Sequence, residues 1–104
     1  MDVPLGEWSK TYFATDHIQT ICDQVIRNVE EKTGRVYDKY KAVFYRVKNL
    51  LVQHYIFKVY VGDDYLHLWV TDACGSTGYL NIEVLGVQQN HKWNDLLEPF
   101  DHNN

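Results

Sequence analysis

The chain has few of the features that commonly announce a protein's function. Its 2 cysteines, Cys22 and Cys74, stand far apart and form no CxxC pair, so no disulfide framework is predicted. No apolar run approaches the roughly 18 residues of a membrane-spanning helix, and no basic stretch followed by an apolar one opens the chain. These absences, together with free thiols, indicate a reducing, cytoplasmic setting and no membrane partner.

Positive charge is also scarce. Ten Lys and Arg residues stand against 14 Asp and Glu, which gives a formal net charge of −4, and the basic residues are spread along the chain. Binding to a phosphate backbone depends on clustered Lys and Arg side chains. We therefore expect no nucleic-acid partner.

Motifs of catalysis and metal binding are missing as well. The 5 histidines share no ligand spacing, so His54 and His67 are interpreted as solvated strand positions, and no metal is predicted. Cys74 with the later His91 is the one nucleophile-and-base pair that can be assembled, but the neighbouring Asp72 has the wrong charge to stabilise a thiolate. Phosphate-binding and nucleophile-elbow motifs are absent too. The sequence therefore predicts no enzyme and no cofactor.

Regular apolar periodicity is what the sequence does have. From Thr15 onward apolar residues recur at the spacing of one helix face, which predicts a long amphipathic helix. The residues of this stripe are Ile18, Ile21, Cys22, Val25, Ile26 and Val29. Thr15 or Asp16 can cap the start, and Gly34 supplies the left-handed residue that ends the helix. Cys22 lies in the stripe and is interpreted as a small buried hydrophobe.

After Gly34 the apolar period changes to two, which predicts a four-stranded antiparallel meander. Its strands fall around residues 40–45, 55–61, 65–71 and 80–84. A helix with one apolar stripe and a sheet with one apolar face can bury both in a two-layer core. We therefore predict a single α+β domain over residues 1–104, with an extended N-terminal arm at 1–14 and a polar tail at 101–104.

Three apolar stretches are not needed by such a core. They are the arm around Gly6, the tip Leu50-Leu51-Val52 between the first two strands, and the loop from Ala73 to Gly78. Connections in an up-and-down meander alternate between the two ends of the sheet, so the tip and the loop project from the same edge, and the arm can run along the sheet to reach it. An exposed apolar patch of this kind usually marks a binding site.

Several short motifs, in order and at nearly unchanged spacing, resemble those of the stefins (type 1 cystatins), intracellular inhibitors of papain-like cysteine proteases. Gly6 is followed at the family's interval by the helix opening at Ala14-Thr15. Tyr40-Lys41-Ala42-Val43 is similar to the stefin F-K-A-V motif. The run from Tyr55 to Asp64, YIFKVYVGDD, resembles Y-F-I-K-V-H-V-G-D-D. The likeness covers nearly the whole chain.

The resemblance implies a cystatin-like fold, in which a four- to five-stranded antiparallel sheet wraps around one long α-helix and the arm supplies the extra strand. It also implies reversible, tight-binding inhibition of papain-like proteases such as cathepsins, by a wedge that fills the active-site cleft. The protease-binding residues that it implies are Pro4, Leu5, Gly6, Lys48, Asn49, Leu50, Leu51, Val52, Ala73, Cys74 and Gly75.

The chain departs from the stefin pattern at both hairpins. Stefins carry Q-V-V-A-G in the first hairpin, where this chain has Lys48-Asn49-Leu50-Leu51-Val52, and Cys74-Gly75 corresponds to the family's Leu-Pro. Because a β-branched residue tolerates positive φ poorly, Val52 in place of glycine predicts a different turn. A second function therefore stays open, that of a cystatin-fold module that binds a partner or a second copy without inhibiting. We expect a monomer, with a domain-swapped dimer as the alternative.

Overall fold

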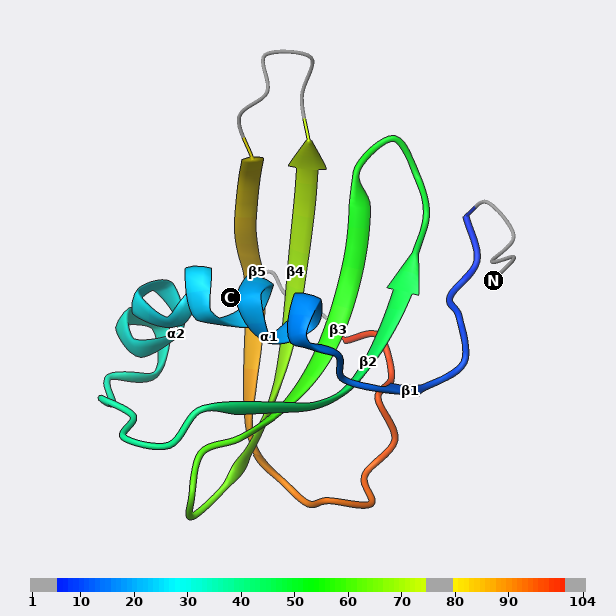
Figure 1. Ribbon diagram of the computed structural model, residues 1–104. Coiled ribbons are helices and arrows are strands. Elements are labelled where there is room, and N and C mark those ends of the chain that lie inside the picture. The colour runs from blue at the N-terminus through cyan, green and yellow to red at the C-terminus, as the bar shows by residue number, and fades with distance from the viewer. Residues whose placement is uncertain (1–5, 75–79, 101–104) are drawn as a thin grey trace.

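The computed structural model describes residues 6–74 and 80–100, which form five antiparallel strands and two helices (Figure 1). In chain order the elements are β1 (Tyr12–Phe13), α1 (Asp16–Gln24), α2 (Ile26–Thr33), β2 (Lys41–Lys48), β3 (Gln53–Tyr60), β4 (Tyr65–Cys74) and β5 (Leu80–His91). The strands lie side by side in the order β1-β2-β3-β4-β5. The predicted α+β meander is thus confirmed, and the arm supplies the fifth strand by pairing Tyr12 with Tyr45 and Phe13 with Phe44.

The helical stretch begins and ends where its capping residues predict. The Thr15 hydroxyl accepts a hydrogen bond from the Ile18 backbone N–H at 3.3 Å, and Gly34 ends α2 in the left-handed region at φ +73°. The single predicted helix is interrupted at Val25, whose backbone (φ −107°, ψ 6°) leaves the helical region and whose N–H donates to the Cys22 carbonyl at 3.2 Å. No helix among the described residues is long and apolar enough to cross a membrane.

The helix stripe and one face of the sheet form the main core. On the helices the buried residues are Ile18, Ile21, Cys22, Val25 and Val29, and on the sheet they include Phe57, Val59, Leu66, Leu68 and Val70. Val25 stays in the core despite its irregular backbone, so the interruption keeps the apolar sides of both helices on the sheet. Burial raises the pKa of the Cys22 thiol, which keeps it neutral and agrees with its interpretation as a small hydrophobe.

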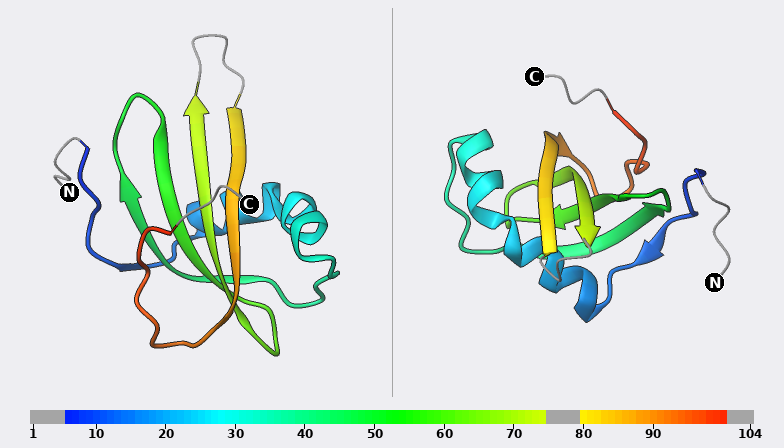
Figure 2. Two further views of the ribbon diagram at one scale, coloured as in Figure 1. Left: turned by 180° about the vertical axis from the view of Figure 1, so that it is seen from behind. Right: turned by 90° about the horizontal axis from the view of Figure 1, so that it is seen from above.

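The opposite face of the sheet is buried as well. The segment after β5, residues 92–100, crosses this outer face while the helices cover the other one (Figure 2). Beneath it Ile56, Lys58 and His67 are at most 1% exposed. The interpretation of His67 as a solvated position is therefore wrong, because its ring stacks on His91 with 3.5 Å between the ring centroids.

Lys58 and Arg46 tie residues 92–100 to the outer face. The Lys58 ammonium donates hydrogen bonds to the carbonyls of Lys92, Trp93 and Asp95 at 2.8, 2.5 and 2.6 Å. The Arg46 guanidinium donates to the Leu97 carbonyl at 2.7 Å, and the Leu97 side chain is 3% exposed. The outer segment, as we call residues 92–100, therefore forms a third layer that the apolar alternation of the strands did not predict.

Candidate functional site

The predicted site residues that the structure describes gather at one end of the sheet, the end where the connections β2–β3 and β4–β5 lie, which we call the edge. The connection between β2 and β3 rises there, β4 ends and β5 begins there, and the N-terminal arm runs beside β2 toward the same edge (Figure 1). The turn between β3 and β4 lies at the other end. Of the predicted contact residues, Pro4, Leu5 and Gly75 lie outside the described part of the chain.

Gly6 joins the arm to the tip of the first hairpin. Its backbone N–H donates to the Asn49 carbonyl at 2.9 Å, and its φ of +80° places it in the left-handed region that glycine adopts most easily. A Cβ atom at this position would lie 3.6 Å from Cδ2 of Leu50. Gly6 therefore bends the arm directly against the aliphatic tip.

Trp8 and Ser9 hold the arm along β2, and sequence reasoning assigned no role to either. Trp8 forms an isolated antiparallel bridge with Lys48, whose ammonium lies 5.1 Å from the centre of the Trp8 ring. The Ser9 N–H donates to the Val47 carbonyl at 2.8 Å, and the Ser9 hydroxyl accepts from the Val47 N–H at 3.0 Å. These contacts continue the pairing of β1 with β2 toward the edge.

The tip of the first hairpin holds its aliphatic side chains in solvent. Leu51 is 104% exposed and Leu50 42% exposed, while Lys48, Asn49 and Val52 are half-buried. Among the described residues the non-glycine residue with positive φ is Asn90, so Val52 lies outside the left-handed region. The departure from the family glycine is thus accommodated by a turn in which Val52 keeps a negative φ.

Residues below the tip support it by polar contacts. The Gln53 side-chain amide donates to the Asn49 side-chain oxygen at 3.4 Å and accepts from the Tyr55 hydroxyl at 2.8 Å. Burial, with a smaller effect of nearby Asp72, raises the pKa of Tyr55 and keeps that hydroxyl protonated. The chain of contacts links the tip to Tyr55, which is part of the core.

The second hairpin contributes the far side of the edge. Ala73 is half-buried on β4 and pairs with Asn81, and the backbone of Cys74 pairs with Leu80. Within the described residues no group of three His, Cys, Asp or Glu side chains could hold a metal ion. The large apolar side chains that the described part of the edge exposes are those of Leu50 and Leu51.

Comparison with known proteins agrees with this architecture, although no protein-family model matches the chain. It is 41% identical over 96 residues to cystatin-A of Homo sapiens, covering 91% of this chain and 97% of that protein. It is 38% identical over 96 residues to stefin-2 of Mus musculus, covering 91% of each. It is 40% identical over 88 residues to leukocyte cysteine proteinase inhibitor 1 of Sus scrofa, covering 84% of each.

The names of these relatives are those of stefins, cystatins and a proteinase inhibitor, which agrees with the prediction that the chain is not an enzyme. Their similarity extends over nearly the whole chain, and the five-stranded sheet packed on a helical layer is the fold that the resemblance implied. The chain belongs to the stefin (type 1 cystatin) family.

Proposed function

We propose that this protein is a reversible, tight-binding inhibitor of papain-like cysteine proteases, cathepsins among them, and that it acts in the cytoplasm as a monomer. Membership of the stefin family and the name of the porcine relative, a cysteine proteinase inhibitor, support this function. The observation that carries it is the joining of Gly6 to Asn49 beside an exposed Leu51. This contact gives one edge a narrow, apolar apex built from two distant parts of the chain.

The proposed mechanism is steric occlusion of the active-site cleft. Leu50 and Leu51 lose their water when they enter the cleft, and this loss of exposed apolar surface drives association. The half-buried Val52 and the pairing of Gly6 with Asn49 fix the tip before binding, so little chain entropy is lost on association.

Each part of the edge has its own place in the proposed complex. The arm, with Pro4, Leu5 and Gly6, occupies the non-primed subsites. The first hairpin at Lys48–Val52 and the second at Ala73, Cys74 and Gly75 cover the primed side. The protease thiol is shielded without receiving a peptide bond that it can cut, so inhibition is reversible and involves no covalent step.

Titration of papain with the purified protein tests the function. We expect stoichiometric inhibition, and we expect Leu51→Asp to weaken it at least about 100-fold, because the cleft would desolvate an unpaired carboxylate. Leu96→Asp is the matched control, since Leu96 is 75% exposed on the outer segment, away from the edge. Absence of inhibition by the unaltered protein, or equal inhibition by both variants, would contradict the proposal.

A non-inhibitory module that self-associates is the competing function. It would be supported by a stable dimer in size-exclusion chromatography whose formation requires Leu51 and excludes papain. The departure that left this alternative open, Val52 in place of the family glycine, does not favour it, because Val52 needs no left-handed backbone.

A further inference from the structure

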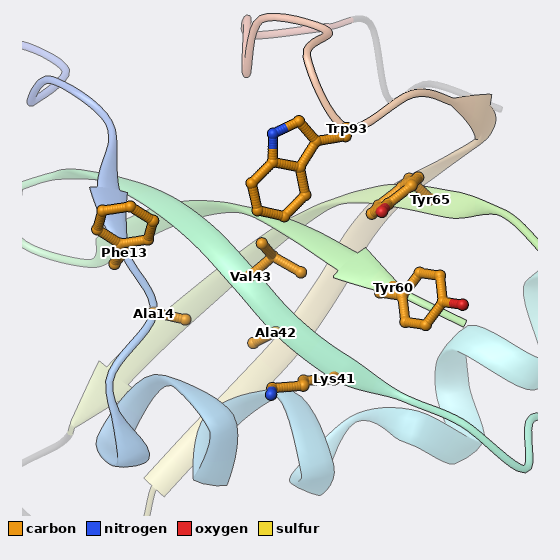
Figure 3. A pocket seen from close by; sticks show the side chains of 8 residues that line it. All are labelled: Phe13, Ala14, Lys41, Ala42, Val43, Tyr60, Tyr65 and Trp93. Carbon is orange, nitrogen blue, oxygen red and sulfur yellow. The ribbon is translucent and has the colours of Figure 1, made fainter. Parts of the chain in front are cut away.

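A second candidate site lies at the other end of the sheet from Gly6 and the aliphatic tip. It is a pocket of about 380 Å³ between the end of β1, the start of β2, the end of β3, the start of β4 and the start of the outer segment (Figure 3). Ligand pockets commonly begin at about 300 Å³, so this one has room for a small molecule. Its walls come from five parts of the chain that the fold itself fixes.

Three of its side chains form a row across the sheet. Lys41 on β2 pairs with Tyr60 on β3, and Tyr60 pairs with Tyr65 on β4. Directly opposed residues project from the same face of a sheet, so the three residues border the pocket from that face, with the side chains of Lys41 and Tyr60 running apart from each other (Figure 3). The rings of Tyr60 and Tyr65 lie 5.2 Å apart between their centroids.

Two further aromatic rings, those of Trp93 and Phe13, line the pocket, and the Phe44 ring contacts both of them from outside the lining. Tyr65 meets Trp93 edge-on at 6.3 Å, Trp93 lies 4.8 Å from Phe44, and Phe44 lies 5.2 Å from Phe13. Trp93 is 51% exposed and Phe13 74% exposed, so two large rings keep much of their surface in water beside the opening. A flat ring placed among them would make the edge-to-face and offset contacts that aromatic groups favour.

Charge distinguishes the ligand that the pocket fits. Among the described residues that line it, Lys41 is the one that carries a charge and none carries a carboxylate. In the described part of the chain no acceptor, carboxylate or ring is found in contact with the Lys41 ammonium, which is exposed. The ammonium of Lys41 therefore favours an anion in this pocket although the protein as a whole has a net charge of −4, and it would repel a cation that the rings alone could attract.

We propose that the pocket binds small aromatic monocarboxylates, with the ring lying against Trp93 and Tyr65 and the carboxylate on the Lys41 ammonium. A second copy of the chain is a poorer occupant. Two copies joined through this patch would bury both Lys41 ammonium groups without a carboxylate from the lining residues to pair them. The site lies at the other end of the sheet from the proposed protease-contact edge, so we expect binding there to leave inhibition unchanged.

Two matched probes test the proposal by heteronuclear NMR at pH 7. 2-Naphthoate carries the carboxylate, and 2-naphthalenemethanol presents the same rings without charge. We expect saturable shifts of the amides of Lys41, Tyr60 and Tyr65 and of the Trp93 indole with 2-naphthoate, and at least about five-fold weaker binding of the alcohol. Shifts that do not saturate, equal affinities for the two probes, or shifts concentrated at residues 49–52 would overturn the proposal.

Two variants assign the binding to its residues. Lys41→Gln should weaken 2-naphthoate binding about five-fold and leave the alcohol unaffected, whereas Lys32→Gln, which removes an exposed charge on α2, should change neither. Trp93→Ala should weaken both probes about ten-fold, and it keeps the main-chain carbonyl that Lys58 contacts. Unchanged binding by Lys41→Gln, or ligand-free shifts of these residues that depend on protein concentration, would contradict the assignment.

Discussion

At the scale of single residues, Gly6 and Gly34 share a left-handed backbone but differ in what surrounds them. Their φ values are +80° and +73°, and a Cβ would meet Leu50 at Gly6 but nothing within 4 Å at Gly34. An alanine in the left-handed region costs about 1 kcal/mol. At Gly6 the arm can move away and relieve this strain. At Gly34 the strain remains, and it destabilises the end of α2.

We therefore expect Gly6→Ala to weaken inhibition of papain about five-fold or more while leaving the free energy of unfolding nearly unchanged. Gly34→Ala should do the reverse, lowering the free energy of unfolding by about 1 kcal/mol with unaltered inhibition. Inhibition assays and urea denaturation of both variants measure the two effects. If both variants inhibit like the unaltered protein, the bend at Gly6 has no part in binding.

At Val52 the informative substitution is the reverse one, from a larger residue to glycine. Because its backbone is not left-handed, glycine at this position relieves no strain and only adds conformational freedom that binding must remove. We expect Val52→Gly to weaken inhibition about two- to five-fold across a panel of papain-like proteases. Tighter inhibition by Val52→Gly would show that the bound tip needs a backbone that valine resists.

At the scale of elements, the outer segment depends on one buried ammonium group. Lys58 is 1% exposed, and its ammonium donates hydrogen bonds to three carbonyls of that segment. Burial lowers the pKa of the Lys58 side chain. Substitution by methionine keeps the aliphatic stem but leaves the three carbonyls without their donor. We expect Lys58→Met to lower the free energy of unfolding by about 3 kcal/mol, measured by urea denaturation.

Lys32→Met is the matched control for Lys58→Met. Lys32 is exposed in the last turn of α2, so its loss should change stability by less than about 0.5 kcal/mol. Equal stabilities of the two variants would mean that the outer segment contributes little to the fold.

Some elements of the fold can be predicted from the sequence, and others cannot. The helix caps at Thr15 and Gly34, the four strands and the edge that gathers Gly6 and Leu50 all follow from local signals and from the alternation of connections. The burial of Lys58 does not, because its partners lie 34 to 37 residues away in a segment without apolar periodicity. A lysine is expected to be solvent-exposed when only the sequence is known, because the carbonyls that accept its hydrogen bonds are brought near it only by the fold.

The candidate site also has parts that the sequence predicts and parts that it does not. Its aliphatic tip is visible in sequence because Leu50 and Leu51 interrupt a polar connection. The role of Ser9 is not, since its hydroxyl pairs with a backbone group 38 residues later. The interruption at Val25 also has no local signal, because neither glycine nor proline stands there.

At the scale of the whole molecule, polar groups of the outer face make stability depend on pH. The His67 ring stacks on His91, and His67 pairs across the strands with Lys58, whose ammonium donates to the Asp95 carbonyl. Burial, with the nearby His91 and Lys58, lowers the pKa of His67 from 6.5 to about 3. The hydrogen bond from His91 also lowers the pKa of Asp95, which adds a loss of stability at still lower pH.

The direction of the pH dependence follows from the pH at which the folded and the unfolded chain each bind a proton at His67. As pH falls below about 6.5 the unfolded chain protonates His67 while the folded chain does not, so stability that is complete above this pH is lost progressively toward pH 3. Between pH 7 and pH 5 we expect this group alone to lower the free energy of unfolding by about 2 kcal/mol. Urea denaturation at a series of pH values measures the loss.

His67→Phe isolates the contribution of this histidine. The buried Nε2 of His67 has no hydrogen-bond partner among the described residues, so a phenyl ring can replace the imidazole without leaving a donor or acceptor unpaired, and it keeps the stacking on His91. We expect the variant to match the unaltered protein at pH 7 and to lose about 2 kcal/mol less on going to pH 5. The same pH dependence in both proteins would show that His67 accepts its proton within the fold, which requires the outer segment to open before the molecule unfolds.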